Sequence, residues 1–391
     1  MNGVIYLDYA ASTPLDTSVA EVMDACARSP AGIGNASASH AYGRAAAQAV
    51  ELAAGQVAQL IGGAPEEIIW TSGATESDNL AVIGAAMFRC RQGRHLVTVT
   101  TEHPAVLESC RHLEQQGFSV TYLCPDSDGL LPVDRIAAAI RPDTTLVSVM
   151  HVNNETGVIQ DIGAIGALCR ERGVLFHVDA AQSAGRLPID VRRQSIDLLS
   201  LSAHKSYGPK GAGVLFLDRR RCRRVEPLLY GGGQQRGLRP GTLAVPLIVG
   251  MGRAFELARE RQSQDVVHAT ALRDRLWSQL KLIDGVLLNG SPAQRACHIL
   301  NVSVTGVHGE SLHCALRNLA VARGSACAAD SGEPSSVLRS LGRSDALAYG
   351  SVRFSVGRDT NEADIDLAAA CFREAVDRLR EIAPRAPAGM V

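Results

Sequence analysis

Several features that mark common classes of protein are absent from this sequence. No apolar run among the 391 residues is long enough to span a membrane, which excludes a transmembrane helix. There is no long run of lysine or arginine and the formal net charge is -1, which argues against a surface dedicated to nucleic acid. The five arginines between residues 219 and 224 are expected to form a solvated turn. The pattern G-x-x-x-x-G-K-[ST] is also missing, which excludes a P-loop nucleotide site.

The ten cysteines include no C-x-x-C pair, and no signal peptide follows Met1. We therefore expect free thiols in a reducing cytoplasm and no metal site. Cysteines within helical patterns are usually buried and inert. Five fall in such patterns: Cys26, Cys90, Cys110, Cys169 and Cys371. With 46% hydrophobic residues, the chain can bury a large core and divide into about two domains.

Lysine is scarce, because only Lys205, Lys210 and Lys281 occur among 39 basic residues. The apolar residues 198–201 predict a buried strand just before Lys205. A lysine at the end of such a strand in an α/β protein lies at the sheet edge where ligands bind. A partly desolvated amine also loses its proton readily, as a lysine that forms an imine must do. The alternative for Lys205 is a solvated surface charge.

Strand-like and helical segments alternate along much of the chain, which predicts a mostly parallel, doubly wound sheet. The expected strands are residues 67–70, 95–100, 119–123, 145–150, 174–178, 197–201 and 213–217. Helices are expected at 41–61 and within 245–280, whereas 31–40 is expected to lack regular structure. Further on, a strand is expected at 299–304 and helices at 310–319 and 361–380.

Polar clusters directly follow four of these strands, and they include His103, Asn154, Asp179 and Lys205. Since the carboxyl ends of parallel strands share one edge of a sheet, four clusters there indicate a single site. Each residue alone has an ordinary alternative: a core histidine, a turn residue, a helix cap or a surface charge.

A Ser-Gly turn at residues 72–73 precedes a helix that begins near Thr75. Such a helix terminus favours an anion, although a capping box formed by Ser72 or Thr75 is equally compatible with the pattern. Taken together, the clusters supply an aromatic plate, a carboxylate, a phosphate cradle and an amine. That is the inventory needed to hold pyridoxal 5'-phosphate (PLP), whose ring nitrogen, phosphate and aldehyde need an acid, a helix terminus and a lysine.

Five runs of the sequence resemble the group I cysteine desulfurases, the NifS and IscS type within the class V aminotransferase superfamily. They are Thr-Ser-Gly-Ala-Thr-Glu-Ser-Asp-Asn, Thr-Glu-His, His-Val-Asn-Asn-Glu, His-Val-Asp-Ala-Ala-Gln and Ser-Ala-His-Lys-Ser-Tyr-Gly-Pro-Lys-Gly. The resemblance implies PLP fold type I, with a large α/β domain around a mostly parallel seven-stranded sheet and a smaller α+β domain. The large domain is expected at residues 15–260, and the small domain at 1–14 and 261–391.

The same resemblance assigns roles around the cofactor ring. Lys205 is expected to bind the aldehyde, and Asp179 to pair with the ring nitrogen. Gln182 is expected to contact the ring hydroxyl, and His103 to stack on the ring and move protons.

The resemblance also places residues around the phosphate and the substrate. The expected phosphate contacts are Ala74, Thr75, Ser202 and His204. The resemblance also implies a homodimer with shared sites. Thr242 of the partner subunit is therefore expected to reach the phosphate too. Asn154 and Arg353 are expected to hold the substrate carboxylate, a task that suits the planar guanidinium fork.

Cys327 differs from the helical cysteines because it lies in a polar loop at about residues 323–335. The run Gly-Ser-Ala-Cys matches the nucleophile motif of the family, and the loop resembles the long mobile loop of the group I enzymes. Arg323 departs from the small or polar residues usual before this motif. Its charge either favours the Cys327 thiolate or points to solvent.

The resemblance implies that the chain converts L-cysteine to L-alanine and holds the sulfur as a persulfide on Cys327 for a protein acceptor. The candidate destinations are iron-sulfur assembly, tRNA thiolation and DNA phosphorothioation of the DndA-like branch. Compared with the cluster-assembly enzymes, the chain is short after Arg380, where their scaffold partner tends to dock. This favours a single dedicated sulfur acceptor, such as one for DNA modification, with nucleic acid handled by partner proteins. The alternatives are another class V enzyme, either an aminotransferase or a selenocysteine lyase, and a non-catalytic sulfur-pathway scaffold.

Overall fold

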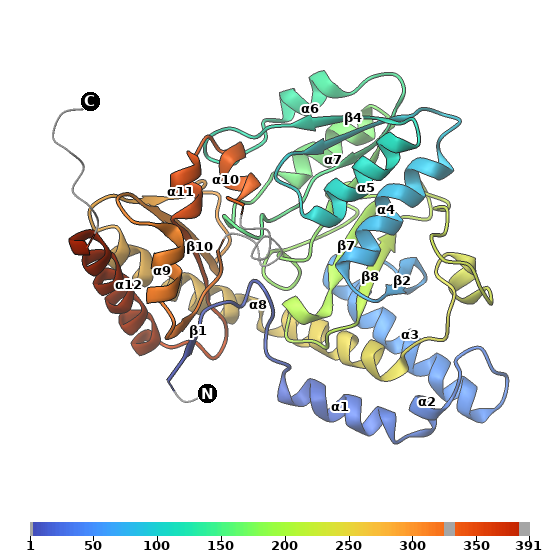
Figure 1. Ribbon diagram of the computed structural model, residues 1–391. Helices are drawn as coiled ribbons and strands as arrows, with labels where there is room; N and C mark the ends of the chain where they lie inside the picture. Colours follow the sequence, from blue (N-terminus) through green and yellow to red (C-terminus); the bar gives the residue numbers. More distant parts are fainter. Residues whose placement is uncertain (1–2, 324–332, 383–391) are drawn as a thin grey trace.

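The computed structural model describes residues 3–323 and 333–382, which build two hydrophobic cores side by side (Figure 1). No helix in these two ranges is both long and apolar enough to cross a bilayer.

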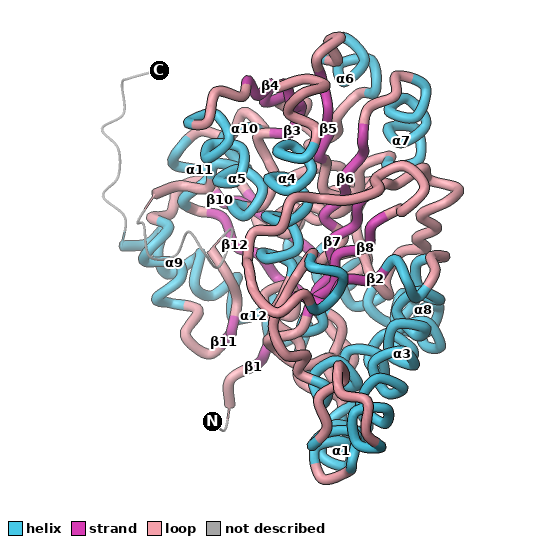
Figure 2. The backbone as a smooth tube through the Cα atoms, turned by 90° about the vertical axis from the view of Figure 1, so that its right-hand side faces the viewer, coloured by secondary structure: helices cyan, strands magenta, loops and turns pink. Residues whose placement is uncertain are grey.

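The larger core surrounds a seven-stranded sheet with the order β2-β8-β7-β6-β5-β3-β4, which Figure 2 shows from the side. The strands are β2 (Ile68–Thr71), β3 (His95–Val99), β4 (Ser119–Leu123), β5 (Thr144–Ser148), β6 (Leu175–Asp179), β7 (Leu198–Ser202) and β8 (Gly213–Leu217). Only β8 runs antiparallel to its neighbours, β2 and β7. The predicted sheet is therefore confirmed, and each strand lies within a few residues of its expected position.

Helices cover both faces of this sheet, which is why most of its strands are buried at every residue. Successive residues of one strand pack on opposite faces of the sheet, as Leu146 and Val147 of β5 do. One face carries α4 (Ala74–Phe88) and α5 (Pro104–Gln115). The other packs against α3 (Ala41–Ile61), α6 (Val133–Ala139), α7 (Ile162–Glu171) and the first half of α8 (Val245–Leu280).

The helix predictions for α3 and α8 match the structure at both ends. The stretch 31–40, expected to be irregular, is partly helical, because α2 (Pro30–Ile33) follows α1 (Thr17–Ala27). Its single turn depends on local signals: the Ser29 side chain caps Ala31 N–H, and proline occupies the first helical position. The helical pattern of Ala31, Gly32 and Ile33 is too weak to predict this turn from the sequence.

The smaller core surrounds an antiparallel sheet with the order β12-β10-β9, made of β9 (Val286–Leu288), β10 (Ile299–Val304) and β12 (Ser351–Ser355). Around it lie the second half of α8, α9 (Gly309–Ala315), α10 (Ser336–Ser340), α11 (Asp345–Tyr349) and α12 (Glu362–Ile382). α9 ends at Ala315, four residues before the predicted end at residue 319, because β11 (Leu319–Ala320) follows it and pairs with β1 (Ile5–Tyr6).

The amino-terminal segment runs from the smaller core to the edge of the large sheet. Ser355 N–H donates to the Leu7 carbonyl at 2.7 Å, and Ala10 N–H donates to Ser355 Oγ at 2.9 Å. These contacts fix residues 7–10 along β12. The carbonyl groups of Ala10 and Ala11 consequently face the ends of β6 and β7.

Close backbone packing between β8 and the turn before α4 yields a stability prediction. A Cβ atom added at Gly213 lies 2.4 Å from Gly73 Cα, so Gly213→Ala must push this turn away. We expect it to lower the free energy of unfolding by about 1–3 kcal/mol. Gly55→Ala is the control, since nothing lies within 4 Å of its added Cβ and it is in the interior of α3. That change should stabilise the protein by about 0.5–1 kcal/mol. The measurement is denaturant unfolding. A free energy of unfolding that is higher for Gly213→Ala than for Gly55→Ala contradicts the prediction.

Candidate active site

A cavity of about 550 Å³ opens at the carboxyl edge of the seven-stranded sheet. Ten residues predicted from the sequence line it: Ala74, Thr75, His103, Asn154, Asp179, Gln182, Ser202, His204, Lys205 and Arg353. They come from α4, from the ends of parallel strands and from β12. The fold thus brings together nearly all of the predicted site.

The amino end of α4 forms one wall of this cavity. Gly73 is the N-cap residue, and no side chain hydrogen-bonds to the helix terminus as a cap. The capping-box alternative for Ser72 or Thr75 is therefore wrong. Without a side-chain cap, the backbone N–H groups of the first turn are available to an anion.

Lys205 follows β7 and reaches across the cavity to the amino-terminal segment. Its Nζ donates to the carbonyl oxygens of Ala10 and Ala11, both at 2.7 Å. Burial, followed by the positive charge of Arg353, lowers the pKa of Lys205 to about 8. Roughly a tenth of the amine is therefore neutral and nucleophilic at pH 7, far more than for an ordinary lysine.

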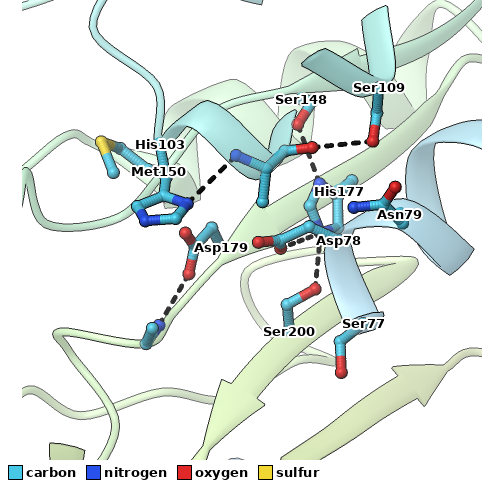
Figure 3. A network of polar contacts seen from close by, with 12 residues as sticks. Ser77, Asp78, Asn79, His103, Ser109, Ser148, Met150, His177, Asp179 and Ser200 are labelled. Atoms are coloured by element: carbon cyan, nitrogen blue, oxygen red, sulfur yellow. Dashed lines mark hydrogen bonds and ion pairs between the residues drawn. The ribbon is translucent and has the colours of Figure 1, made fainter. Parts of the chain in front are cut away.

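Asp179 ends β6 beneath the His103 ring (Figure 3). Its Oδ1 accepts Ala181 N–H at 2.8 Å, which fixes the carboxylate. Burial raises the pKa of Asp179, while the neighbouring His103 and Lys205 oppose that shift. A buried carboxylate of this kind gains most from a cationic partner, such as a protonated ring nitrogen.

His103 is the N-cap residue of α5, and its Nδ1 accepts Ala105 N–H at 3.1 Å. Burial lowers the pKa of His103, so the ring is neutral at pH 7. In that form the proton lies on Nε2, because Nδ1 serves as the acceptor. The Nε2–H group of His103 can consequently donate a proton.

A polar network behind Asp179 was not predicted. Asp78 of α4 is fully buried, and its Oδ1 lies 3.6 Å from His177 Nε2. His177 also contacts Ser148 Oγ at 2.8 Å and Ser200 Oγ at 3.0 Å, as Figure 3 shows. The available sequence signal was a carboxylate one turn into a helix that continues with the small and apolar residues 80–87.

Two buried carboxyl groups, Asp78 and Asp179, cannot both carry a negative charge at low cost. Burial and then the charge of Asp179 raise the pKa of Asp78 well above its ordinary value. Asp179 accepts a backbone N–H and faces His103 and Lys205, whereas Asp78 accepts no backbone N–H from the described residues and lies beside His177 and Ser200. Asp78 is therefore the protonated member and Asp179 the ionised one.

Gln182 and His204 complete the wall nearest the amino-terminal segment. Gln182 Nε2 donates to the Ala10 carbonyl at 2.8 Å, and His204 Nδ1 lies 3.3 Å from Ser12 Oγ. Burial, followed by the charge of Lys205, lowers the pKa of His204 to about 4. This neutral ring can accept or donate a hydrogen bond without adding charge.

Arg353 lies at the far end of the cavity and is 1% exposed. Its Nη1 donates to the Asn154 carbonyl at 2.8 Å, and its Nη2 pairs with Asp8 Oδ1 at 2.6 Å. Nε has no hydrogen-bond partner among the described residues. Since a guanidinium carries five N–H groups, these two contacts fix its plane and leave donors for a further anion.

Two predicted residues remain, Thr242 and Cys327. Thr242 lies outside the cavity of this chain, and Cys327 lies outside the described residues. The described residues flanking that range are anchored at the Arg353 end: Ala322 pairs with Arg353 through both backbone groups, and Ser335 Oγ contacts Glu155. Arg323 Nη1 lies 3.8 Å from Glu310 Oε1, so its side chain has an acidic neighbour.

The cavity fits PLP on structural grounds. It combines a helix terminus without a side-chain cap, a buried carboxylate, a desolvated lysine amine and an imidazole above the carboxylate. These are the groups that the phosphate, ring nitrogen, aldehyde and ring face of PLP require.

Comparison with known proteins agrees with this geometry. Residues 5–367 match the family described as aminotransferase class-V. A cysteine desulfurase IscS from Tolumonas auensis is 55% identical over 381 residues, covering 97% of this chain and 94% of the relative. Two solved structures are a NifS-like protein and DndA from Streptomyces lividans. The first has a TM-score of 0.88 at 33% identity, covering 96% of this chain and 100% of that one. The second has a TM-score of 0.76 at 40% identity, covering 90% and 99%. The chain therefore belongs to the class V aminotransferase family and, within it, to the PLP-dependent cysteine desulfurases.

Proposed function

We propose that this chain removes sulfur from L-cysteine, releases L-alanine and holds the sulfur as a persulfide on Cys327. The observation that carries the proposal is the position of Lys205, Asp179 and Arg353 around one cavity. The anchoring of Ala322 and Ser335 at the Arg353 end supports a role for the cysteine between them.

PLP, when bound, supplies an electron sink that weakens bonds at the carbon skeleton of the substrate. Lys205 would hold its aldehyde, Asp179 its ring nitrogen, His103 its ring face and Gln182 its ring hydroxyl. Four residues would hold the phosphate: Ala74, Thr75, Ser202 and His204. The ionised state of Asp179, supported by the protonated Asp78 behind it, keeps negative charge at the ring nitrogen.

Arg353 and the Asn154 side chain would hold the substrate carboxylate. Because Asp8 and the Asn154 carbonyl fix the guanidinium, the carboxylate meets donors that are already oriented. A carboxylate held there would leave the α-carbon facing Lys205, whose neutral amine could accept the α-proton. His103 Nε2–H can then supply a proton to the departing product.

The sulfur step forms one bond and breaks one. The Cys327 thiolate attacks the substrate sulfur, a sulfur–sulfur bond forms, and the carbon–sulfur electron pair stays with the carbon skeleton. Protonation of that skeleton gives alanine. The enzyme thiol is thereby oxidised to a persulfide, and the substrate carbon is reduced by the same two electrons.

We further propose a homodimer in which Thr242 of the partner subunit reaches the phosphate. The position of Thr242 outside its own cavity supports this arrangement. We propose a large domain at residues 15–260 and a small domain at 1–14 and 261–391. The division of α8 between the two cores supports a boundary within that helix, since Leu257 packs in one core and Ala269 in the other.

The proposed acceptor of the sulfur is a protein of iron-sulfur assembly, tRNA thiolation or DNA phosphorothioation, without direct contact to nucleic acid. A cytoplasmic location is proposed because the nine cysteines of the described residues are all free thiols.

Replacement of the proposed nucleophile tests the function directly. We expect Cys327→Ser to lower alanine and sulfide release from L-cysteine by about 100-fold or more, since a hydroxyl is a far weaker nucleophile toward sulfur. The absorption band of the lysine-bound cofactor should persist. Cys314→Ser, which changes an exposed cysteine of α9, is the control. Undiminished release by Cys327→Ser would favour an aminotransferase or a selenocysteine lyase.

The lowered pKa of Lys205 predicts how cofactor attachment depends on pH. Only the neutral amine attacks the aldehyde, so attachment of PLP to the cofactor-free protein should rise with pH and level off above about 8. Below that pH the rate should fall about tenfold per unit. Stopped-flow absorbance measures the rate, and Lys205→Ala supplies the blank. A midpoint near the ordinary lysine value of 10.5 contradicts the prediction.

Arg353→Gln should weaken binding of substrates that carry a carboxylate. We expect KM for L-cysteine to rise by about 10- to 100-fold, because charge-assisted hydrogen bonds to the carboxylate are lost. Binding of cysteamine, which lacks the carboxylate, should change little. Arg339→Gln, at an exposed pair with Asp345, serves as the control. Equal losses for both compounds would argue against the assigned role.

A further inference from the structure

A carboxylate occupies the first turn of α4, where the cofactor phosphate is proposed to bind. Glu76 lines the cavity with Ser72 and Thr75. Its Oε2 accepts Ser72 N–H at 2.7 Å, so it also shapes the turn that forms the cradle. A second negative charge at a helix terminus competes with a phosphate for the same dipole and the same amides.

Arg239 neutralises this carboxylate. Its Nε donates to Glu76 Oε1 at 2.7 Å and its Nη2 to Glu76 Oε2 at 3.2 Å, which is a two-pronged ion pair. The two side chains are 23% and 19% exposed, so water screens the pair only in part. Although burial alone raises it, the hydrogen bonds from Arg239 and Ser72 lower the pKa of Glu76, which is therefore ionised.

The segment that supplies Arg239 is also fixed to the strand before the cradle. Gln235 Oε1 accepts Trp70 N–H at 2.6 Å, and Gln235 Nε2 donates to the Trp70 carbonyl at 2.8 Å. Because β2 is an edge strand, this amide side chain takes the place of a neighbouring strand. The same Nε2 donates to the Arg239 carbonyl at 3.1 Å.

Backbone strain accompanies this arrangement. Gln235 and Arg236 have φ values of 51° and 61°, a left-handed conformation that is costly for residues other than glycine. Such strain persists only where the surroundings fix it. Here the contacts to Trp70 and Glu76 hold the segment 234–239 on both sides of the Ser72–Gly73 turn.

We propose that Arg239 is a positioning residue for the cofactor phosphate. It cancels the charge of Glu76 in the cradle, holds the turn that carries the amides, and fixes the start of the segment that leads to Thr242. The proposal rests on the proposed function in one respect, namely that the phosphate binds at the amino end of α4. It assigns no contact between Arg239 and the phosphate itself.

The test compares binding of PLP and of pyridoxal, which lacks the phosphate, to the cofactor-free full chain. Absorbance titration gives a dissociation constant for each. We expect Arg239→Gln to weaken PLP binding by about tenfold or more, because Glu76 is then an uncompensated charge beside the phosphate. Pyridoxal binding should change by less than about threefold, since no phosphate is present.

The double variant decides between charge compensation and simple loss of structure. Glu76→Gln keeps an oxygen for Ser72 N–H and removes the charge, so Glu76→Gln with Arg239→Gln should restore PLP binding to within about threefold of the unmodified chain. Arg253→Gln, which breaks a similarly buried pair with Glu256 on α8, should leave both dissociation constants unchanged.

Three results would overturn the proposal: unchanged PLP binding in Arg239→Gln, a double variant as weak as that single variant, or equal weakening of PLP and pyridoxal. Failure of the proposed function is seen separately, because the unmodified chain would then bind no PLP at Lys205 or release no alanine from L-cysteine.

Discussion

Removal of water from charged groups is the constraint on which this site depends. The carboxyl edge of the large sheet gathers an amine, an ionised carboxylate and a guanidinium in a space covered by α4, β12 and the amino-terminal segment. Burial lowers the pKa of Lys205 and raises that of Asp179, a rise that His103, the Ala181 N–H and Lys205 oppose. Burial thus sets the protonation state that each residue needs before any substrate binds.

The cost of burying negative charge is limited by the way Asp78 and Asp179 share a proton. Asp78 and Asp179 lie close enough to repel each other, and the proton rests on Asp78, which has no backbone donor. His177, whose pKa burial lowers to about 3, stays neutral between two serine hydroxyls. A neutral layer therefore supports a single negative charge at the position opposite the cofactor ring.

Segments far apart in the chain meet at both ends of the cavity. At one end, Asp8 and Asn154 hold Arg353 from different elements. At the other, Glu76 and Arg239 pair across 163 positions of sequence. Each end is the proposed site of an anionic group, the substrate carboxylate or the cofactor phosphate, and at each end an acid pairs with the arginine. Both ends therefore contain a buried or half-buried ion pair whose arginine keeps further N–H donors.

The sequence by itself determined the parallel sheet, the long helices α3 and α8, and the residues that follow the strands. Their signals are local: apolar runs, helical periodicity and motifs such as the one around Lys205 carry them within a few residues. Tertiary structure alone placed Asp78 beside His177 and paired Glu76 with Arg239. Those outcomes depend on which distant groups share a desolvated space, and no local pattern records that.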